Sequence, residues 1–520
     1  MVVIDGLLVC KACQYNASVI QRSDILEQLY TGAECRELDR IAIEEHGIDG
    51  FELMRRAGRA AFAELLTRWP EAGSLSICCG KGNNAGDGYI IAGLAREIGV
   101  SVELVQLGDP KQLRGTAARA RDWAVNRGVD ILSGPTDVLR GDVVVDALLG
   151  TGIVGDLRPA YEDMVKVINN AGCGVLAVDI PTGVNADTGS ACEVSVRADV
   201  TVTFIGRKLG LYTGPGVSLC GDVVYAGLGV PDAVFRSARG CSLLRYAQLP
   251  ALEPRDANAY KQALGHVAVI GGDHNMGGAA LMAAEAALRV GAGLVSVVTR
   301  ACHRSAMLSR RPELMVVDAD DDEARQELLT RATTLIVGPG LGRSSWGHKL
   351  LIEAISLGKP VLLDADGLHG FATLGLQSSG PIIVTPHAGE AAVMLETTSR
   401  RIQSDRINAV KRLAKRVSGV AVLKGAGTVI AECGEHGPML AGVCGHGNPG
   451  MASAGMGDVL SGVVGGLLAQ HIAPAHAAVR GVCLHSAAAD AAAEQVGQRS
   501  LLASDLLPAM MEILRDSEQV

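Results

Sequence analysis

Near its C-terminal end the chain reads Gly445-His-Gly-Asn-Pro-Gly-Met-Ala-Ser-Ala-Gly-Met-Gly457-Asp458, followed by an apolar run that extends to Leu468. The spacing of that run predicts a helix that begins directly after a glycine-rich loop. Such a junction leaves backbone N–H groups without partners at the positive end of the helix dipole, so it predicts an anion site, most simply for phosphate. Asp458 stands at the helix entrance, where it could serve as a base for an attacking hydroxyl in phosphoryl transfer.

Asp458 also has a purely structural explanation. Asp is a favoured N-cap residue, and for an isolated Gly-x-Gly-Asp capping is the commoner role. A functional role is favoured here because other glycine-rich loops of the same kind occur elsewhere in the chain.

The length and composition predict two large α/β domains. The 520 residues are more than one hydrophobic core can hold. Since 48% of the residues are hydrophobic but only 3% are aromatic, the interior must consist mainly of Ala, Val, Leu and Ile. The 65 glycines exceed the usual share of about 7%, which is typical of folds in which helices lie close to sheets.

The charge and the cysteine content of the chain limit which partners and which cellular compartment we expect. A formal net charge of −9 without a basic run argues against nucleic acid or an anionic membrane as partner. The chain shows neither an apolar stretch of membrane-helix length nor the pattern of a signal peptide. Thirteen irregularly spaced cysteines suit a reducing compartment, and the single Cys-x-x-Cys at Cys10 and Cys13 lacks the second pair that zinc would need. We therefore expect a cytoplasmic protein.

The first half of the chain has the pattern of a parallel sheet. Residues 1–28 show no sustained periodicity, and we expect them to form an extension without a fixed fold. Two amphipathic helices follow from residue 33, and strand and helix patterns then alternate as far as Phe204. This β-α-β rhythm predicts a parallel sheet covered by helices on both faces, in which ligands bind at the carboxyl ends of the strands.

Three segments place glycine or polar residues just past a predicted strand. They are Gly80-Lys-Gly-Asn-Asn-Ala-Gly-Asp87-Gly88, Asp146-Ala-Leu-Leu-Gly-Thr-Gly152 and Asp179-Ile-Pro-Thr-Gly183. The first precedes a helix predicted at 89–98, and its spacing differs from the Gly-x-Gly-x-x-Gly of an ordinary dinucleotide site. Each segment alone is more often a capped turn, but their order on successive strands predicts that they converge on one ligand.

Together these segments resemble the NAD(P)H-hydrate epimerase domain, over about residues 30–235. The resemblance implies a Rossmann-like three-layer α/β/α fold that binds a hydrated dinucleotide, with Asp179 as the catalytic residue at the reacting ring. Two positions depart from the family pattern, since Ala85 replaces the usual Gly and Thr182 the usual Ser. The implied substrate-binding residues are Asn83, Asn84, Ala85, Gly86, Asp87, Gly150, Thr151, Gly152, Ile153, Val154, Gly155, Asp156 and Asp179, and the implied potassium ligands are Asn84, Asp146 and Thr182, whose oxygens suit a hard monovalent ion.

A polar, proline-interrupted stretch between residues 228 and 265 predicts a domain boundary. A second alternation of strands and helices follows it and closes with the helix after Asp458. A Gly-x4-Gly-Lys-Ser/Thr motif does not occur, which disfavours a Walker-type nucleotide site. The predicted division is an extension at 1–28, an N-terminal domain at 29–238 and a C-terminal domain at 239–520.

The loops after the strands of the second series are again rich in glycine and polar groups. Lys424-Gly-Ala-Gly-Thr428 joins a cation to backbone N–H groups and a hydroxyl, as a diphosphate site requires. Asp364 and Asp366 follow another strand, either as partners of magnesium or water or as simple caps. His387 follows a third strand, and a lone histidine is more often structural than functional.

This ordered set resembles the ribokinase-like superfamily, and in particular ADP-dependent NAD(P)H-hydrate dehydratase, over most of residues 240–515. The resemblance implies a C-terminal ribokinase-like α/β domain that uses Mg²⁺ and ADP, with Asp458 as the catalytic residue. The loop at 274–276 departs from the family, where a Tyr is common. The implied hydrate-binding residues are Ala279, Gly340, His387 and Asp458, and the implied ADP-binding residues are Lys424, Gly425, Ala426, Gly427, Thr428 and Gly457.

The two resemblances together imply a bifunctional enzyme that repairs hydrated NADH and NADPH. One domain would interconvert the R and S hydrates at C6, and the other would use ADP to dehydrate the S hydrate, releasing AMP and phosphate. The expected partners are the small molecules NADHX, NADPHX and ADP, with neither nucleic acid nor membrane, and we expect a homo-oligomer.

Two rival functions stay open from the residues alone. A ribokinase-like small-molecule kinase would use the same Asp458 and end with a stable phosphate ester. A nucleotide-binding regulator would require neither Asp458 nor Asp179 to be chemically competent.

Overall fold

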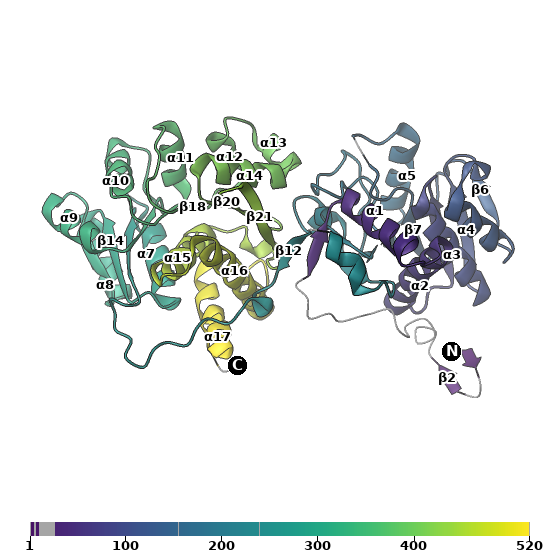
Figure 1. The fold of residues 1–520 in the computed structure, drawn as a ribbon, viewed down its shortest axis with the longest axis horizontal. Coiled ribbons are helices and arrows are strands. Elements are labelled where there is room, and N and C mark those ends of the chain that lie inside the picture. Colours follow the sequence, from purple (N-terminus) through teal and green to yellow (C-terminus); the bar gives the residue numbers. More distant parts are fainter. Residues whose placement is uncertain (1, 5–6, 10–26, 154, 239, 519–520) are drawn as a thin grey trace. The chain divides into compact units, whose positions relative to one another are not determined.

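The computed structural model describes residues 2–4, 7–9, 27–153, 155–238 and 240–518 (Figure 1). The chain divides into two compact units, unit 1 (Met1–Cys241) and unit 2 (Ser242–Val520). The expected extension at 1–28 falls mostly outside the described residues, apart from β1 (Val2–Ile4), β2 (Leu7–Val9) and the beginning of β3 (Gln28–Tyr30). Within the described ranges no helix is both long and apolar enough to cross a membrane.

Unit 1 is built on a parallel sheet with the strand order β11-β9-β8-β7-β4-β5-β6. β4 comes first in the sequence of these strands, and β5 and β7 pair with its two opposite edges. Strand order therefore reverses between β4 and β7, which is where parallel sheets form ligand crevices. The strands are β4 (Ser74–Cys79), β5 (Ser101–Gln106), β6 (Ile131–Ser133), β7 (Val143–Ala147), β8 (Gly174–Val178), β9 (Val200–Phe204) and β11 (Asp222–Ala226).

Helices cover both faces of this sheet because side chains alternate along each buried strand. On β4, Ile77 and Cys79 pack with α2, α3 and α4, whereas Cys78 between them packs with α5 on the opposite face. The predicted three-layer α/β/α architecture is thus confirmed. The helices are α1 (Gly32–Arg40), α2 (Gly50–Arg68), α3 (Asn83–Glu97), α4 (Gly115–Val125), α5 (Pro159–Asn169) and α6 (Gly216–Leu219).

Helix α3 begins earlier than the sequence pattern predicts. It includes Asn83 to Gly88, a stretch that the pattern assigns to a loop. The reason is tertiary packing, because a Cβ on Gly88 would lie 2.7 Å from the Cβ of Ala147, and one on Gly86 would lie 2.4 Å from Sδ of Met54. Bare backbone lets this first part of the helix fit against β7 and α2 and overrides its weak helix propensity.

Unit 2 contains a mixed sheet with the order β12-β21-β20-β19-β18-β17-β16-β13-β14-β15. From β19 to β15 all pairs are parallel, and the pairs β19–β20 and β20–β21 are antiparallel. Strand order reverses between β13 and β16. The strands are β12 (Cys241–Leu244), β13 (His266–Ile270), β14 (Leu294–Thr299), β15 (Met315–Asp318), β16 (Thr334–Val337), β17 (Val361–Leu363), β18 (Ile382–Val384), β19 (Val420–Leu423), β20 (Val429–Gly434) and β21 (Gly437–Cys444).

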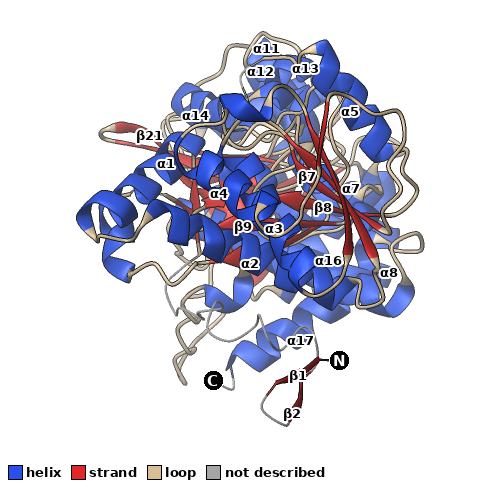
Figure 2. Ribbon diagram, turned by 90° about the vertical axis from the view of Figure 1, so that its right-hand side faces the viewer, coloured by secondary structure: helices blue, strands red, loops and turns tan. Residues whose placement is uncertain are grey.

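Helices again cover both faces of the sheet in unit 2. Figure 2 colours the helices of the chain blue and its strands red. Val267 and Val269 of β13 pack with the layer of α7, α15 and α16, whereas Ala268 and Ile270 pack with the layer of α10, α11 and α14. The helices are α7 (Gly277–Arg289), α8 (Arg304–Arg310), α9 (Asp322–Arg331), α10 (Ser345–Ser356), α11 (Ala365–Thr373), α12 (Ala388–Met394), α13 (Ser399–Ser404), α14 (Arg406–Val417), α15 (Met456–Ala469), α16 (Pro474–Val496) and α17 (Leu506–Glu518).

Helix α15 lies in close contact with α7. A Cβ on Gly462 would lie 2.1 Å from the backbone oxygen of Ala283, and one on Gly466 would lie 3.0 Å from Cα of Ala287. The contact moves from Gly462 and Ala283 to Gly466 and Ala287, which is one turn toward the C-terminus in each helix. Helices α7 and α15 therefore run parallel. Their N-terminal ends therefore point the same way, and their dipoles add at that end.

We predict that Gly462→Val destabilises unit 2 by about 3 kcal/mol, because the added side chain collides with the α7 backbone and overpacks the interface. Urea denaturation followed by circular dichroism measures the change. Gly434→Val is the matched control, because a Cβ at the exposed Gly434 of β20 would meet nothing within 4 Å. Equal unfolding midpoints for the two variants would contradict the close packing of α15 on α7.

Candidate active sites

Unit 1 contains a cavity of about 680 Å³ at the carboxyl ends of β4, β7, β8 and β9. Because these strands are parallel neighbours, the residues that follow them meet at one edge of the sheet. Ala85, Gly86 and Gly155 do not line this cavity, and Val154 lies outside the described residues. The predicted site residues that do line it are Asn83, Asn84, Asp87, Gly150, Thr151, Gly152, Ile153, Asp156 and Asp179.

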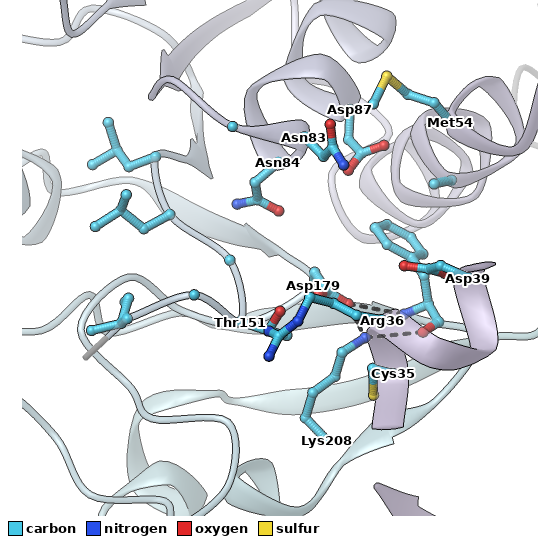
Figure 3. A pocket seen from close by; sticks show the side chains of 18 of the residues that line it. Cys35, Arg36, Asp39, Met54, Asn83, Asn84, Asp87, Thr151, Asp179 and Lys208 are labelled. Atoms are coloured by element: carbon cyan, nitrogen blue, oxygen red, sulfur yellow. Dashed lines mark hydrogen bonds and ion pairs between the residues drawn. The ribbon is translucent and has the colours of Figure 1, made fainter. Parts of the chain in front are cut away.

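Asp179 follows β8 directly and is held from two sides (Figure 3). Its Oδ1 contacts the ammonium of Lys208 and accepts a hydrogen bond from Phe204 N at 3.2 Å. Its φ of +68° lies in the left-handed region, which is uncommon outside glycine and typical of strained functional positions. Burial opposes the charge of Lys208, but the negative charge of Asp179 outweighs it, so the pKa of Lys208 is raised.

Lys208 is only 2% exposed, and its Nζ also donates to the carbonyl oxygen of Phe204 at 2.9 Å. The sequence pattern missed it because it stands in β10 (Arg207–Lys208), after the last predicted strand of this domain and in no recognised motif. The pair Arg207–Lys208 between apolar and glycine residues would have been the only signal.

The three predicted potassium ligands lie at the same edge of the sheet. The carboxylate of Asp146 is fully buried and accepts hydrogen bonds from Leu148 N at 3.2 Å and from Thr182 N and Oγ1 at 2.8 Å each, all of which are uncharged donors. Asn84 is 8% exposed, and its Nδ2 has no hydrogen-bond partner in the described structure. Gly150, in the loop after β7, lies close to Asn84, because a Cβ on Gly150 would lie 3.6 Å from Oδ1 of Asn84.

In unit 2 five of the predicted segments follow neighbouring parallel strands, β13 and β16 to β19, whereas Gly457 and Asp458 lie in the first turn of α15, after β21. Gly340, after β16, has a φ of +60°, and a Cβ on it would lie 3.3 Å from the Cβ of Ala279 in the first turn of α7. These two positions thus form a surface of nearly bare backbone. Within the described ranges no three His, Cys, Asp or Glu side chains are grouped as a metal site.

Lys424 and Asp364 form the charged centre of this edge. Lys424 Nζ lies 2.6 Å from Oδ1 of Asp364, and Ser461 Oγ donates to Oδ2 of Asp364 at 2.8 Å. A Cβ on Gly457 would lie 3.3 Å from Lys424 Nζ, so the ammonium stands beside the first turn of α15. The carboxylate of Asp364 thus contacts two side chains and makes no hydrogen bond that caps α11.

Asp458 is the third residue of α15, and its side chain does not cap the helix, because the N-cap position is Gly455. In the described part of the chain its carboxylate makes no hydrogen bond. Burial and the negative charge of Asp364 raise the pKa of Asp458 to about 6, and Lys424 opposes this rise. A half-buried carboxylate next to a helix N-terminus and an ammonium is suited to accept a proton near neutral pH.

His387 has the structural role that the sequence left open. Its Nδ1 accepts hydrogen bonds from Gly389 N at 2.9 Å and Glu390 N at 3.2 Å, which caps α12. The opposite nitrogen, Nε2, lies 3.3 Å from Oε1 of Glu390. The side chain is still 60% exposed, so capping does not exclude contact with a ligand.

Arg406 supports the loop that begins at Lys424, and the sequence pattern did not identify it. Its buried guanidinium donates to the carbonyl oxygens of Leu423 at 3.0 Å, Lys424 at 3.3 Å and Gly427 at 3.4 Å. These bonds draw the carbonyl oxygens inward. The N–H groups of Gly425 and its neighbour Ala426 make no hydrogen bond in the described part of the chain, which is the arrangement of an anion-binding loop.

Two family models match the chain. One described as NAD(P)H-hydrate dehydratase matches residues 267–511, and one described as YjeF-related protein N-terminus matches residues 50–210. The two matched segments fall in unit 2 and unit 1, respectively.

Curated relatives match over both units. The bifunctional NAD(P)H-hydrate repair enzyme Nnr of Coxiella burnetii is 46% identical over 486 residues, covering 92% of this chain and 98% of that protein. The enzyme of the same name from Escherichia coli is 40% identical and covers 92% of this chain and 93% of that protein. A solved structure of ADP/ATP-dependent NAD(P)H-hydrate dehydratase from Bacillus subtilis, co-crystallised with ATP and Mg²⁺, is 28% identical with a TM-score of 0.46, covering 51% of this chain and 95% of that chain.

We predict that Arg406→Met loosens the loop at 424–428 and lowers the free energy of unfolding of unit 2 by about 3 kcal/mol, because it leaves buried carbonyl oxygens without a donor. Hydrogen exchange of the loop amides should become faster in the variant. Arg412→Met on the exposed side of the same helix is the matched control. Unchanged exchange in the Arg406 variant would show that the guanidinium does not hold the loop.

Proposed function

The chain belongs to the family of bifunctional NAD(P)H-hydrate repair enzymes, and we propose that it carries out both family reactions with the residues described above. Unit 1 epimerises the R and S hydrates of NADH and NADPH at C6. Unit 2 dehydrates the S hydrate at the expense of ADP and releases NAD(P)H, AMP and phosphate. The observation that carries this assignment is the position of Asp458 beside Lys424 and Gly457 at the start of α15.

The dehydration begins with a phosphoryl transfer. Asp458 accepts the proton of the C6 hydroxyl while the hydroxyl oxygen attacks the β-phosphorus of ADP and AMP leaves. Lys424 and the N–H groups of Gly425 and Gly457 stabilise the phosphoryl charge, because they are fixed before the reaction starts. Phosphate is then a good leaving group from C6. The ring nitrogen supplies electrons for its departure, and loss of a proton from C5 restores the dihydropyridine.

The substrate of unit 2 would lie between the two parallel helices and the strand ends. Ala279, Gly340 and His387 surround the nicotinamide part, and the loop Lys424, Gly425, Ala426, Gly427 and Thr428 holds the ADP diphosphate. The nearly bare backbone at Ala279 and Gly340 fits a flat ring, and the N–H groups of Gly425 and Ala426 fit an anion. Mg²⁺ would bind together with the nucleotide. In proteins it commonly binds through one or two carboxylates and the phosphates of the substrate, whose negative charge it balances.

Epimerisation in unit 1 centres on Asp179. The C6 hydroxyl is released as water and returned on the opposite face, so that either hydrate becomes available to unit 2. Asp179 moves a proton at this position, and Lys208 holds its carboxylate at the end of β8. The loop residues from Asn83 to Asp87 and from Gly150 to Asp156 bind the rest of the dinucleotide.

A potassium ion fits the group of Asn84, Asp146 and Thr182. The carboxylate of Asp146 is buried with uncharged donors only, so a cation would balance its charge. The unpartnered amide nitrogen of Asn84 and its oxygen are interchangeable by a flip of the amide, which would offer oxygen where a cation needs it. When bound, K⁺ would fix the position of the loops that hold the substrate diphosphate.

We also propose the setting in which these reactions occur. The partners are NADHX, NADPHX and ADP, the chain assembles as a homo-oligomer, and the compartment is the cytoplasm. The support for a reducing compartment is that the cysteines among the described residues are all free, without a disulfide.

Incubation of the protein with mixed NADH hydrates and ADP tests the proposal and separates it from its rivals. Recovery of dihydronicotinamide absorbance with release of AMP is the expected result, whereas a stable phosphorylated product identifies a kinase and binding without turnover a regulator.

Asp458→Asn should reduce the ADP-dependent recovery by about 10²- to 10⁴-fold, since it removes a general base, and spare the exchange of epimers. Asp179→Asn should do the reverse and leave the R hydrate unconsumed. Wild-type rates in either variant would contradict the role of that residue.

The pH dependence of the dehydratase reaction should report Asp458. A base must be ionised, and the pKa of Asp458 is raised to about 6 by burial and the charge of Asp364. The kcat/KM for the S hydrate at saturating ADP should therefore be constant above this value and fall about tenfold for each pH unit below it. Asp458→Asn should lack this acidic limb in its residual activity. A wild-type profile that stays flat well below this pKa would exclude Asp458 as the base.

A further inference from the structure

The cavity of unit 1 contains more carboxyl groups than its one buried cation can balance. Asp39, Asp87, Asp156 and Asp179 line it, of which Asp39 and Asp156 are exposed, so that Asp87 and Asp179 share the one buried ammonium, that of Lys208. Among these carboxyl groups, Lys208 forms its ion pair with Asp179. The other cations that line the cavity are exposed at its rim, where water screens them: Arg36, Lys81 and Arg158.

Asp87 is the carboxyl group that this arrangement leaves buried and without a counter-charge. It lies in the second turn of α3, is 8% exposed and lines the cavity. In the described structure its side chain makes no hydrogen bond. Burial without a compensating hydrogen bond or counter-charge disfavours the ionised form of such a carboxyl group.

The charged neighbours of Asp87 together also favour its neutral form. Burial raises the pKa of Asp87 well above its ordinary value, and the negative charges of Asp179 and Asp39 raise it further. Lys208 acts in the opposite direction without reversing the result. The remaining titratable neighbour is the thiol of Cys79 on β4, which is neutral because burial raises its own pKa.

Figure 3 shows Asp87 and Asp179 reaching the cavity from different elements, one from α3 and one from the end of β8. A carboxyl group without a counter-charge and a carboxylate paired with a buried ammonium, on different walls of one cavity, are suited to act as a general acid and a general base. A single carboxylate beside Lys208 would serve one face of the substrate ring, whereas epimerisation needs proton transfer on both.

We propose that Asp87 is the proton donor of the epimerase reaction and that Asp179 is the matching proton acceptor. The proposal rests on the epimerase function assigned above and deepens it. It gives Asp87 a chemical role in the reaction rather than only a contact with the substrate.

The step balances in atoms and electrons. Asp87 transfers its proton to the C6 hydroxyl, the C6–O bond breaks, and water leaves as the lone pair of the ring nitrogen forms a C=N⁺ bond to C6. A water on the opposite face then attacks C6, and the electron pair returns to the nitrogen. Asp179 accepts the proton of that water. One proton has passed from Asp87 to Asp179, and exchange with solvent restores both groups.

Asp87→Asn tests the proposal, because the amide keeps the size of the side chain but cannot release a proton. The expected result is a fall in epimerase kcat of about 10²- to 10⁴-fold with little change in KM, measured by the exchange of purified S hydrate into R hydrate. The alkaline limb of the wild-type pH–rate profile should disappear in the variant. Glu97→Gln, at the exposed end of the same helix, is the matched control, and ADP-dependent dehydration of the S hydrate by unit 2 reports on the integrity of the same molecules.

The outcomes separate this inference from the function on which it rests. A wild-type protein that does not exchange the epimers overturns the epimerase assignment itself. A wild-type protein that does so, with Asp87→Asn equally fast or with the same alkaline limb, overturns only the role of Asp87.

An infrared measurement on the wild-type protein tests the protonation state even if the variant fails to fold. At about pH 8 ordinary Asp and Glu side chains are ionised, so a carbonyl-stretch band of a protonated carboxylic acid should persist there because of Asp87. Its presence supports the proposal. Its absence in the folded wild-type protein overturns it.

Discussion

Both candidate sites depend on a lysine ammonium paired with an aspartate that directly follows a parallel strand. In unit 1 the pair is Lys208 with Asp179 after β8, and in unit 2 it is Lys424 with Asp364 after β17. Asp364 is 1% exposed and Lys208 2%. Removing such charges from water costs several kcal/mol per ion, so the pairs are weak sources of stability. Their effect is to fix one cation at the edge of each sheet where the ligand-binding loops converge.

A single fixed ammonium divides the carboxylates around it into two kinds. One carboxylate forms an ion pair with the ammonium. A neighbouring carboxyl group has no such partner, and burial disfavours its ionised form. In unit 2 that neighbour is the half-buried Asp458, whose pKa rises only to about 6, so it is ionised at neutral pH and can act as a base. In unit 1 the neighbour is Asp87, which is buried further and whose pKa is raised well above its ordinary value by burial and by the charges of Asp179 and Asp39. The same electrostatic arrangement is therefore consistent with the proposed base in one unit and the proposed acid in the other, because the depth of burial differs.

The sequence predicts the parts of this arrangement that are local in the chain. Alternating strand and helix patterns indicate the two α/β folds, and the loops that begin at Gly80, Asp146 and Lys424 lie where ligand-binding loops of parallel sheets belong. Lys208 and Arg406 could not be predicted in this way, because each acts on residues that only the fold brings near and neither belongs to a local motif. The early start of α3 was missed for a related reason, since its Asn- and Gly-rich first turns gain stability from packing on Met54 and Ala147 rather than from propensity.

Glycine explains how the positive ends of two helix dipoles come to lie near the proposed phosphate site of unit 2. With ordinary side chains two helices pack about 8–10 Å apart, and their N-terminal ends could not meet at one ligand. Gly462 and Gly466 bring α15 against the backbone of α7, and because the two helices run parallel, both positive ends face the same strand edge. Asp458 and Ala279 lie in those first turns. A phosphate there would meet two helix ends and the Lys424 ammonium at once, whereas one helix end alone contributes about 0.3–1 kcal/mol at an exposed position. The glycines of α15 thus weaken the helix in isolation but allow both helix ends to contribute to the proposed anion site.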